Sequence, residues 1–368
     1  MRVHDEVRGL ANEQAQVVDA ASDRLTYVND SEPGITRKPA RSTGFNYAGP
    51  DGKPIKDEEI LDRIRKLAIP PAYTDVWISP DPDGHIQATG RDAKGRKQYR
   101  YHPQWTALQA ETKFARMAAF GRALPKIRKR IEADLKKRGL PREKVLATVV
   151  DLLELTRIRV GNDEYAKQNK SFGLTTLRNK HAKVKGETLK FEFQGKSGVK
   201  HATSLRDRRL ARVVKACQDL PGQRLFQWVD ADGARHAVTS GDVNAYLKEV
   251  TGEDYTAKDF RTWAGTVAAA KALALQPAPT SATDAKRLIA TCVKATAGLL
   301  GNTPAVCRSA YIHPGVIEAF ADGRLPKRFA KADGPAFERA MLKWLDDIAA
   351  ATEQATGITV EKQEKLAA

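Results

Sequence analysis

Tyr311 stands where a phenol could act as a nucleophile. It lies in the stretch 301–314, GNTPAVCRSAYIHP, in which Thr303 is a suitable helix N-cap and Pro304 suits the first helical position. This spacing predicts a short helix that carries Tyr311 two turns on and ends at the following His-Pro pair. The phenol would then sit on a rigid element near a helix end, where it can serve as a nucleophile. A tyrosine more often packs on an amphipathic face, so other residues must decide.

Four polar residues elsewhere could complete a site around such a nucleophile. Arg159 follows the apolar stretch 142–156, which predicts a buried helix, and Lys196 lies in a turn between two predicted strands. Arg261 lies in the helical segment KDFRTWAG, and Asn302 comes nine residues before the tyrosine. A guanidinium group offers a planar fork of donors that matches a phosphate. Each residue alone has an ordinary explanation, since an arginine at a helix end more often forms a surface salt bridge.

The elements that must position these residues are mostly helical. Apolar periodicity after Pro103 predicts helices, and a cluster of short runs predicts a small antiparallel sheet. The expected helices cover residues 105–120, 126–138, 142–156, three segments between 205 and 275, 283–299 and 336–354; the expected strands cover 173–177, 182–185, 188–193 and 199–204. The Gly-Lys-Ser turn at Lys196 resembles the end of a phosphate-binding loop. That motif needs a glycine where Lys190 stands and a helix afterwards, so nucleotide binding is disfavoured.

The first third of the chain has a different residue pattern. Residues 1–22 are mixed and polar, which predicts a flexible N-terminus. Residues 23–105 alternate short apolar or aromatic runs with turn residues, and one amphipathic helix is expected over 57–67. This pattern predicts a small β-rich domain, followed over 106–368 by a larger, mainly helical domain that contains the small sheet. The expected fold class is therefore α+β.

The segment 84–102, GHIQATGRDAKGRKQYRYH, is predicted to form a basic hairpin. Alternation along its second strand places Lys97, Tyr99 and Tyr101 on one face. A sheet surface laid on DNA would use such cations, together with Arg91, on phosphates, and would bring Gln87 near a base edge. The same pattern also fits a solvated hairpin, and spacing alone does not separate the two interpretations.

Composition limits the partners. The net charge is +17, and the first 105 residues hold 16 basic and 16 acidic residues, so the whole excess lies in the remainder. Such a surplus favours a polyanion, above all nucleic acid, as the partner. No apolar run is long enough to span a membrane, and the start lacks the apolar core of a signal peptide, which predicts a cytoplasmic protein. Three scattered cysteines predict neither a disulfide framework nor a metal site.

Taken in order, the candidate residues form a known pattern: an arginine at a helix end, a lysine on a hairpin, a second arginine and a late tyrosine. This is the order of the tyrosine recombinase and type IB topoisomerase superfamily. Over almost its whole length the sequence resembles the poxvirus-like type IB DNA topoisomerases of bacteria. The resemblance rests on the segments GHIQATGRDAKGRKQYRYH, RIRVGN, FQGKSG, KDFRTW and SAYIHP.

The resemblance implies a role for each residue of the site. Tyr311 would be the nucleophile that forms a 3′-phosphotyrosyl link, and Arg159 and Arg261 would bind the two non-bridging oxygens of the phosphate. Lys196 would protonate the leaving 5′-oxygen as the general acid, assisted by Arg159. Asn302 falls where viral relatives have a histidine. Because an amide does not titrate, Asn302 would stabilise the transition state through a hydrogen bond.

The resemblance also implies the reaction and the partner. The enzyme would relax positive and negative supercoils by transient cleavage of one strand and religation, without ATP, metal or another cofactor. It would clamp double-stranded DNA as a monomer associated with the nucleoid, with no nucleotide and no membrane partner. Asn162 and Tyr165 match family positions that contact DNA in the major groove, although viral relatives have a lysine at the first.

Two alternatives compete with this interpretation. A site-specific recombinase shares the catalytic core, but recombinases usually carry a His-x-x-Arg box where this chain has Lys258 to Arg261, and a helical N-terminal domain. A basic architectural protein that binds nucleic acid would explain the charge, but not the ordered Arg, Lys, Arg, Asn and Tyr. The sequence therefore favours the topoisomerase.

Overall fold

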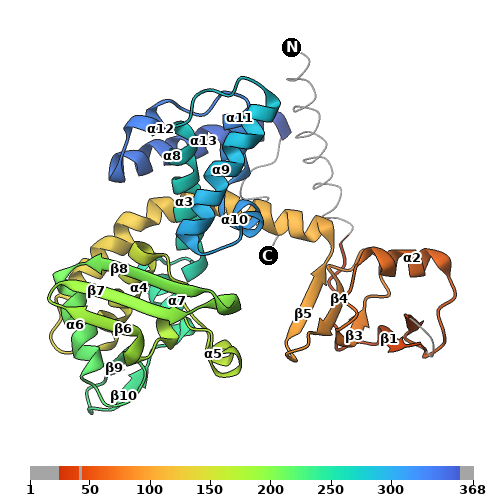
Figure 1. Cartoon of the computed structure of the whole chain (residues 1–368), viewed down its shortest axis with the longest axis horizontal. Coiled ribbons are helices and arrows are strands. Elements are labelled where there is room, and N and C mark those ends of the chain that lie inside the picture. Colours follow the sequence, from red (N-terminus) through yellow and green to blue (C-terminus); the bar gives the residue numbers. More distant parts are fainter. Residues whose placement is uncertain (1–24, 41–43, 357–368) are drawn as a thin grey trace. The chain divides into compact units, whose positions relative to one another are not determined.

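The computed structural model describes residues 25–40 and 44–356. The predicted flexible segment 1–22 lies outside these residues. The chain divides into two compact units, one made of the described residues up to Ala115 and from Ala350, the other of Arg116–Ala349. The fold is α+β, as the sequence predicts, with a small β-rich unit and a larger, mostly helical one (Figure 1). None of the helices in the described part of the chain is long and apolar enough to cross a bilayer.

The β-rich unit is built on one antiparallel sheet. Its five strands run in the order β2-β1-β3-β4-β5. They are β1 (Ile35–Pro39), β2 (Phe45–Ala48), β3 (Thr74–Ile78), β4 (Ile86–Arg91) and β5 (Lys97–Tyr101), and the helix beside them is α2 (Glu58–Lys66). Asp57 caps α2 by accepting hydrogen bonds from the backbone N–H groups of Glu59 and Ile60 at 2.8 and 3.2 Å. The predicted helix and the predicted β4–β5 hairpin are confirmed.

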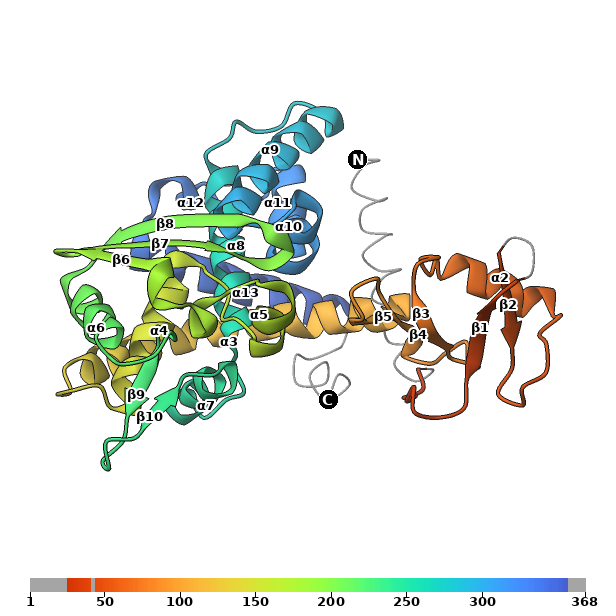
Figure 2. The same cartoon turned by 60° about the horizontal axis from the view of Figure 1, so that its bottom comes forward.

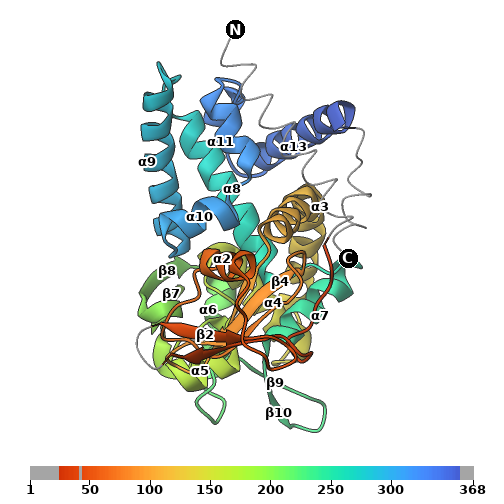
Figure 3. The ribbon, with the colours of Figure 1, turned by 90° about the vertical axis from the view of Figure 1, so that its right-hand side faces the viewer.

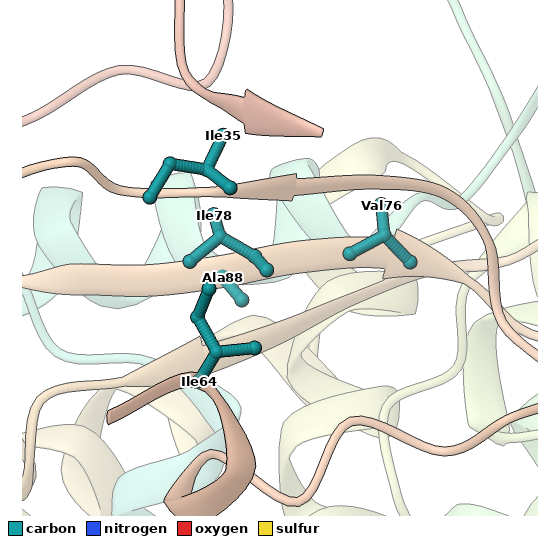
Figure 4. Packing of buried hydrophobic residues seen from close by; sticks show 5 residues of the cluster. All are labelled: Ile35, Ile64, Val76, Ile78 and Ala88. Carbon is teal, nitrogen blue, oxygen red and sulfur yellow. The ribbon is translucent and has the colours of Figure 1, made fainter. Parts of the chain in front are cut away.

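The core of this unit joins the helix to the sheet. Figure 4 shows Ile64 of α2 against side chains of three strands, and Ile78 is fully buried at the centre. The cluster consists of Ile35, Ile64, Val76, Ile78 and Ala88. Strands whose alternate residues are β-branched bury one face in this way, which explains why short aliphatic runs separated by turns fold into a compact sheet.

Gln87 belongs to the interior of this unit. Its side chain is 3% exposed, its Oε1 accepts a hydrogen bond from Arg63 Nη1 at 2.8 Å, and its Nε2 donates to the carbonyls of Pro82 and Gly84 at 2.9 and 2.8 Å. The expectation that Gln87 lies exposed near a base edge was therefore wrong. The physical reason is that Arg63 of α2 and the turn 82–84 enclose the Gln87 amide, whereas the side chains of the edge strand β5 remain largely exposed.

The larger unit surrounds a buried helix with other helices and a small sheet. Its helices are α4 (Arg142–Thr156), α5 (Asp163–Asn169), α6 (Arg208–Gln218), α7 (Ser240–Thr251), α8 (Ala257–Ala274), α9 (Ala282–Leu300), α10 (Pro304–Tyr311), α11 (Pro314–Ala321) and α12 (Arg328–Lys331), together with most of α3 (Pro103–Leu135) and of α13 (Gly334–Thr356), whose remaining residues belong to the other unit. Helix α4 is buried over most of its length and contacts α6, α7 and α8. The prediction of a buried helix before Arg159 is thus confirmed.

Two antiparallel sheets belong to this unit. The three-stranded sheet contains β6 (Ala182–Lys185), β7 (Thr188–Gln194) and β8 (Lys200–Arg206), and the smaller hairpin contains β9 (Gln227–Val229) and β10 (Arg235–Ala237). Figure 2 shows α4 and α6 beneath the three-stranded sheet. Figure 3 shows α8, α9, α10 and α11 packed together as a group. The sequence predicts three of the strands but not the β9–β10 hairpin, whose strands have only three residues each.

Two sequence predictions in this unit were wrong. The helices expected on either side of residues 121–125 form one continuous helix α3 through Pro125, although proline removes a backbone hydrogen bond. Burial of Phe120, Leu124 and Ile127 around it offsets that loss. The strand expected over 173–177 is a 3-10 turn, Leu174–Thr176, because its N–H groups donate to the carbonyls of Arg159 and Val160 at 2.9 and 2.7 Å.

Gln87→Ala tests whether this side chain has a structural role. The substitution removes the side-chain acceptor of Arg63 and a donor to several carbonyls, so the free energy of unfolding should fall by about 2–3 kcal/mol. Urea denaturation followed by tryptophan fluorescence measures this change. Gln98→Ala, in the edge strand of the same sheet, should cost less than about 1 kcal/mol. If Gln87→Ala left stability unchanged and altered the preferred cleavage sequence on DNA, the base-contact hypothesis would be restored.

Candidate active site

Tyr311 is the last residue of α10. Thr303 accepts a hydrogen bond from the backbone N–H of Val306 at 3.4 Å and Pro304 occupies the first turn, so the predicted helix start is confirmed. The Tyr311 carbonyl accepts a hydrogen bond from Thr266 Oγ1 of α8 at 3.2 Å. A Cβ added at Gly265 would lie 2.5 Å from that carbonyl oxygen, so α8 and the end of α10 touch at the backbone. The tyrosine is therefore fixed to α8 and remains partly exposed.

Arg261 projects from the same helix α8 beneath the tyrosine ring. Its Cζ lies 5.1 Å from the centre of the Tyr311 ring, and its side chain is 4% exposed. Its Nη1 donates to the Arg157 carbonyl, and its Nη2 donates to the Leu300 carbonyl at 2.7 Å. These carbonyls belong to the C-terminal ends of α4 and α9, where helix carbonyls lack a partner within the helix. The guanidinium is thus fixed by neutral carbonyl oxygens, which leave its positive charge without a counter-charge.

Asn302 connects the two arginines. Its Oδ1 accepts hydrogen bonds from Arg159 Nη2 and, at 3.4 Å, from Arg261 Nη2, while Arg159 Nη2 also donates to the Gly301 carbonyl at 3.3 Å. Guanidinium groups only donate, so the amide must turn its oxygen toward them. Within the described residues, Asn302 Nδ2 and Arg261 Nε are buried donors with no hydrogen-bond partner. The site therefore holds two donors ready for an acceptor that it does not itself supply.

The electrostatics of this cluster favour an anion. Burial lowers the pKa of Arg159, and the positive charge of Arg261 lowers it further. Among residues 25–40 and 44–356, no ion pair joins either guanidinium to a carboxylate. Two partly or fully buried cations without an anionic partner lose hydration that a bound phosphate diester would replace. The described residues also contain no group of three or more His, Cys, Asp or Glu side chains that could hold a metal ion.

Lys196 is exposed at the tip of the β7–β8 hairpin, as the sequence predicts. The backbone N–H of Gly195 donates to the Val199 carbonyl at 2.8 Å and closes the loop, which contains a short 3-10 turn, Lys196–Gly198. His201 of β8 packs between Gly195 and Gly301 and thereby connects this loop to the residue before Asn302. No motif in the sequence marks His201 as a residue of the site. Only its pairing opposite Phe193 on adjacent predicted strands could have drawn attention to it.

The candidate DNA-contact residues of the β-rich unit lie on the β4–β5 hairpin. Tyr99 and Tyr101 are 43% and 46% exposed and stack with ring centres 5.8 Å apart, and Lys97 Nζ lies 5.4 Å from the centre of the Tyr99 ring. The three side chains thus share one face, as alternation predicts. Lys97 also pairs with Asp30 at 2.5 Å, and this hydrogen bond raises the pKa of Lys97. Arg91 Nη1 donates to the Gly95 carbonyl at 3.0 Å.

Asn162 and Tyr165 lie at the start of α5 in the larger unit. Asn162 Oδ1 accepts a hydrogen bond from the backbone N–H of Tyr165 at 3.1 Å, so Asn162 caps the helix. Tyr165 is 46% exposed. Arg224 pairs with Asp163 at 2.6 Å and holds the first turn in place. The two candidates therefore sit together on one short, anchored helix.

Two family models and several known proteins match this chain. A family model described as the catalytic core of eukaryotic DNA topoisomerase I matches residues 102–327, and a model of the N-terminal domain of bacterial DNA topoisomerase IB matches residues 44–92. DNA topoisomerase 1B of Acanthamoeba polyphaga mimivirus is 33% identical over 294 residues, which cover 78% of this chain and 87% of that protein. DNA topoisomerase 1B of vaccinia virus (strain Copenhagen) is 26% identical, with 76% and 87% covered.

The chain belongs to the type IB DNA topoisomerase family. The resemblance seen in the sequence is thus confirmed, and the protein is an enzyme whose substrate is DNA. The matches cover both units of this topoisomerase, and they favour it over the recombinase and architectural-protein alternatives. The cluster around Asn302 lies inside the matched catalytic core.

His313 of this topoisomerase follows the tyrosine and starts the next helix. The imidazole Nδ1 accepts a hydrogen bond from the backbone N–H of Gly315 at 3.1 Å. The backbone N–H of His313 donates to Thr266 Oγ1 at 3.1 Å. Thr266 therefore binds the backbone on both sides of Ile312, from within α8. Burial lowers the pKa of His313 to about 4, so the imidazole is neutral at neutral pH and can accept the capping hydrogen bond.

The pKa of His313 predicts a pH dependence. An unfolded histidine titrates near 6.5, so the unfolded chain binds more protons than the folded one between pH 6.5 and about 4, and stability falls as the pH drops through that window. His313→Asn keeps a good N-cap without a titrating group. Urea denaturation of both proteins at pH 7.5 and at pH 4 gives the difference in their free energies of unfolding. Between these two pH values the difference should shift in favour of the variant by about 3 kcal/mol. Parallel stability curves for the two proteins would contradict this assignment.

Proposed function

We propose that this topoisomerase relaxes positive and negative supercoils by cutting one strand of double-stranded DNA at Tyr311 and resealing it, without ATP or metal. The observation that carries the proposal is the convergence of four side chains: the Tyr311 ring lies over Arg261, and Arg261 shares the Asn302 oxygen with Arg159. Attack on a phosphodiester requires a nucleophile and fixed positive charge that stabilises the transition state, and the phenol and the arginines supply both.

The cleavage step follows from these groups. The phenolic oxygen of Tyr311 forms a bond to phosphorus while the bond from phosphorus to the 5′-oxygen breaks. Arg159 and Arg261 bind the non-bridging oxygens, whose negative charge grows in the transition state, and Asn302 Nδ2 donates one further hydrogen bond. The phenolic proton passes to solvent and Lys196 gives a proton to the departing 5′-oxygen, so atoms and charge balance. The product is a 3′-phosphotyrosyl link with a free 5′-hydroxyl.

Resealing is the reverse of this step. The phosphotyrosyl diester resembles the phosphodiester it replaces in energy, so attack by the 5′-hydroxyl needs no ATP. Lys196 then accepts the proton of that hydroxyl, and the same cations stabilise the same transition state. Supercoils are released while the free end of the cut strand turns about the intact strand.

DNA contacts outside the reaction centre are proposed for both units. Tyr99, Tyr101 and Lys97 offer exposed aromatic and cationic groups on the β4–β5 hairpin, with Arg91 beside them. Asn162 and Tyr165 offer an amide and an exposed phenol on α5, and Asn162 keeps Nδ2 for DNA because its Oδ1 caps the helix. Gln87 is not included, since its polar atoms are bound inside the sheet. We propose that one chain acts as a monomer, and that the cell's nucleoid is where it meets DNA.

Tyr311→Phe tests the reaction as a whole. The wild-type protein should relax both positively and negatively supercoiled plasmid in EDTA without ATP, and a denaturing gel should show a protein–DNA adduct that maps to the Tyr311 peptide. The variant should bind DNA with unchanged affinity and give neither relaxation nor adduct, because only the nucleophilic oxygen is lost. An adduct of undiminished yield from Tyr311→Phe would move the nucleophile to another residue, and loss of wild-type relaxation in EDTA would contradict metal independence.

Lys196→Ala tests the general acid. Cleavage of an ordinary phosphodiester should slow by ~10² to 10⁴, as is usual when a general acid is removed. A substrate with sulfur at the 5′ position of the scissile bond should restore the rate, because a thiolate leaves without a proton. Lys200→Ala removes an exposed positive charge from the same hairpin and should slow cleavage by less than about tenfold. A Lys196→Ala rate that sulfur does not restore would place the acid elsewhere.

A further inference from the structure

His201 occupies the junction between the Lys196 loop and the arginine cluster. It lies on β8 opposite Phe193 of β7, and the two rings stack with centres 5.2 Å apart and planes 11° apart. In Figure 2 the loop end of the β7–β8 hairpin lies beside α10, which follows Asn302 in the chain. The stacking fixes the plane of the imidazole, and the ring edge that contains Nε2 then faces two loops of the site.

Both loops carry a glycine where the ring approaches. A Cβ added at Gly195 would lie 2.4 Å from His201 Cδ2, and a Cβ added at Gly301 would lie 2.6 Å from His201 Cε1. These two carbons flank Nε2, so both loops approach the same outer edge of the ring, one on each side of Nε2, and this edge separates them as a spacer. Gly301 has φ +61, which by itself favours glycine at that helix end. Gly195 has φ −95, a conformation open to any residue, so only the approach of His201 accounts for its lack of a side chain.

The charge of the junction suits a neutral ring. Burial lowers the pKa of His201, and the positive charges of Arg159 and Arg261 lower it further. A neutral imidazole can lie beside two guanidinium groups without repulsion, whereas a cation there would weaken the cluster. His201 thus contacts both halves of the reaction centre while adding no charge to it.

We propose that His201 is a positioning residue of strand cleavage: its ring spaces the loop that carries Lys196 from the loop that carries Asn302. Gly195 is directly followed by Lys196 and Gly301 by Asn302, so a ring wedged between the glycines sets the separation of the proton donor from the phosphate-binding donors. This inference rests on the proposed role of Lys196. It makes the ring's shape, rather than its nitrogen atoms, the feature that matters.

The inference is tested with the sulfur substrate. His201→Ala leaves the loops without their spacer, so cleavage of the ordinary phosphodiester should slow by about 10- to 100-fold, less than for Lys196→Ala. Because the defect lies in proton delivery, a 5′-sulfur leaving group should restore His201→Ala to within a few fold of wild type. His201→Phe keeps a stacked ring of similar width and should cleave the ordinary substrate at nearly the wild-type rate. A variant that was merely misfolded would cleave the ordinary and the 5′-sulfur substrate more slowly by the same factor.

His236→Ala is the matched control. His236 of β10 also stacks on an aromatic residue of the paired strand, Trp228, with centres 4.1 Å apart, but the β9–β10 hairpin contributes no residue to the site. The variant should cleave both substrates at the wild-type rate. Gly195→Ala provides a second variant that adds a methyl group at the same contact, and it should reproduce the sulfur-rescued defect of His201→Ala.

The outcomes separate this inference from the function on which it rests. If Lys196→Ala is rescued by sulfur but His201→Ala is not, or if His201→Ala cleaves the ordinary substrate like wild type, the role of His201 is refuted and that of Lys196 stands. If Lys196→Ala itself is not rescued, the proposed general acid fails first. Slow cleavage by His201→Phe, equal to that of His201→Ala, would also overturn the inference, since it would show that the ring nitrogens and not the ring's shape are required.

Discussion

The structure depends on two guanidinium groups that are held together although they carry like charges. Arg159 and Arg261 share one neutral acceptor, Asn302 Oδ1, and their other hydrogen bonds go to backbone carbonyls. Burying such charges costs several kcal/mol unless they are well bound. Here the carbonyls come from the last turns of α4 and α9, which carry partial negative charge because helix dipoles align. The helix ends stabilise the cations without neutralising them. A full negative charge beside them would come from the phosphate of the substrate.

The helices of the larger unit are arranged so that they hold these two arginines beside the tyrosine. Helix α4 is buried so that its C-terminal end reaches Arg261, and α8 carries both Arg261 and the Thr266 hydroxyl that fixes the backbone around Tyr311. Helix α9 ends at Gly301, whose left-handed conformation turns the chain so that Asn302 lies against both arginines. The nucleophile, the cations and their acceptor therefore come from elements that pack directly on one another, and the exposed β7–β8 hairpin adds Lys196 from outside that group.

The sequence predicted those parts that depend on local chemistry. The cap at Thr303, the helix over 57–67, the hairpin tip at Lys196 and the order of the site residues were all recognisable, because they rest on neighbouring residues. The errors have a common cause in tertiary structure. Pro125 stays inside a helix because packing on both sides outweighs a lost hydrogen bond, and Gln87 is internal because Arg63 of α2 and the turn 82–84 enclose its amide. The contact of His201 with Gly301 could not be predicted from the sequence, since the two residues lie 100 positions apart in the chain.

The use of main-chain oxygens to hold the arginines has a consequence for how the enzyme tolerates change. A carboxylate partner could be deleted by one substitution, but the carbonyls of Arg157 and Leu300 persist whatever side chains these positions carry. The hydrogen bonds to Arg261 therefore depend on where both helices end, and not on the chemical type of the side chains at residues 157 and 300. A one-residue insertion in α4 or α9 would move these carbonyls away from Arg261. It would therefore disturb the site more than most single substitutions of exposed residues around it.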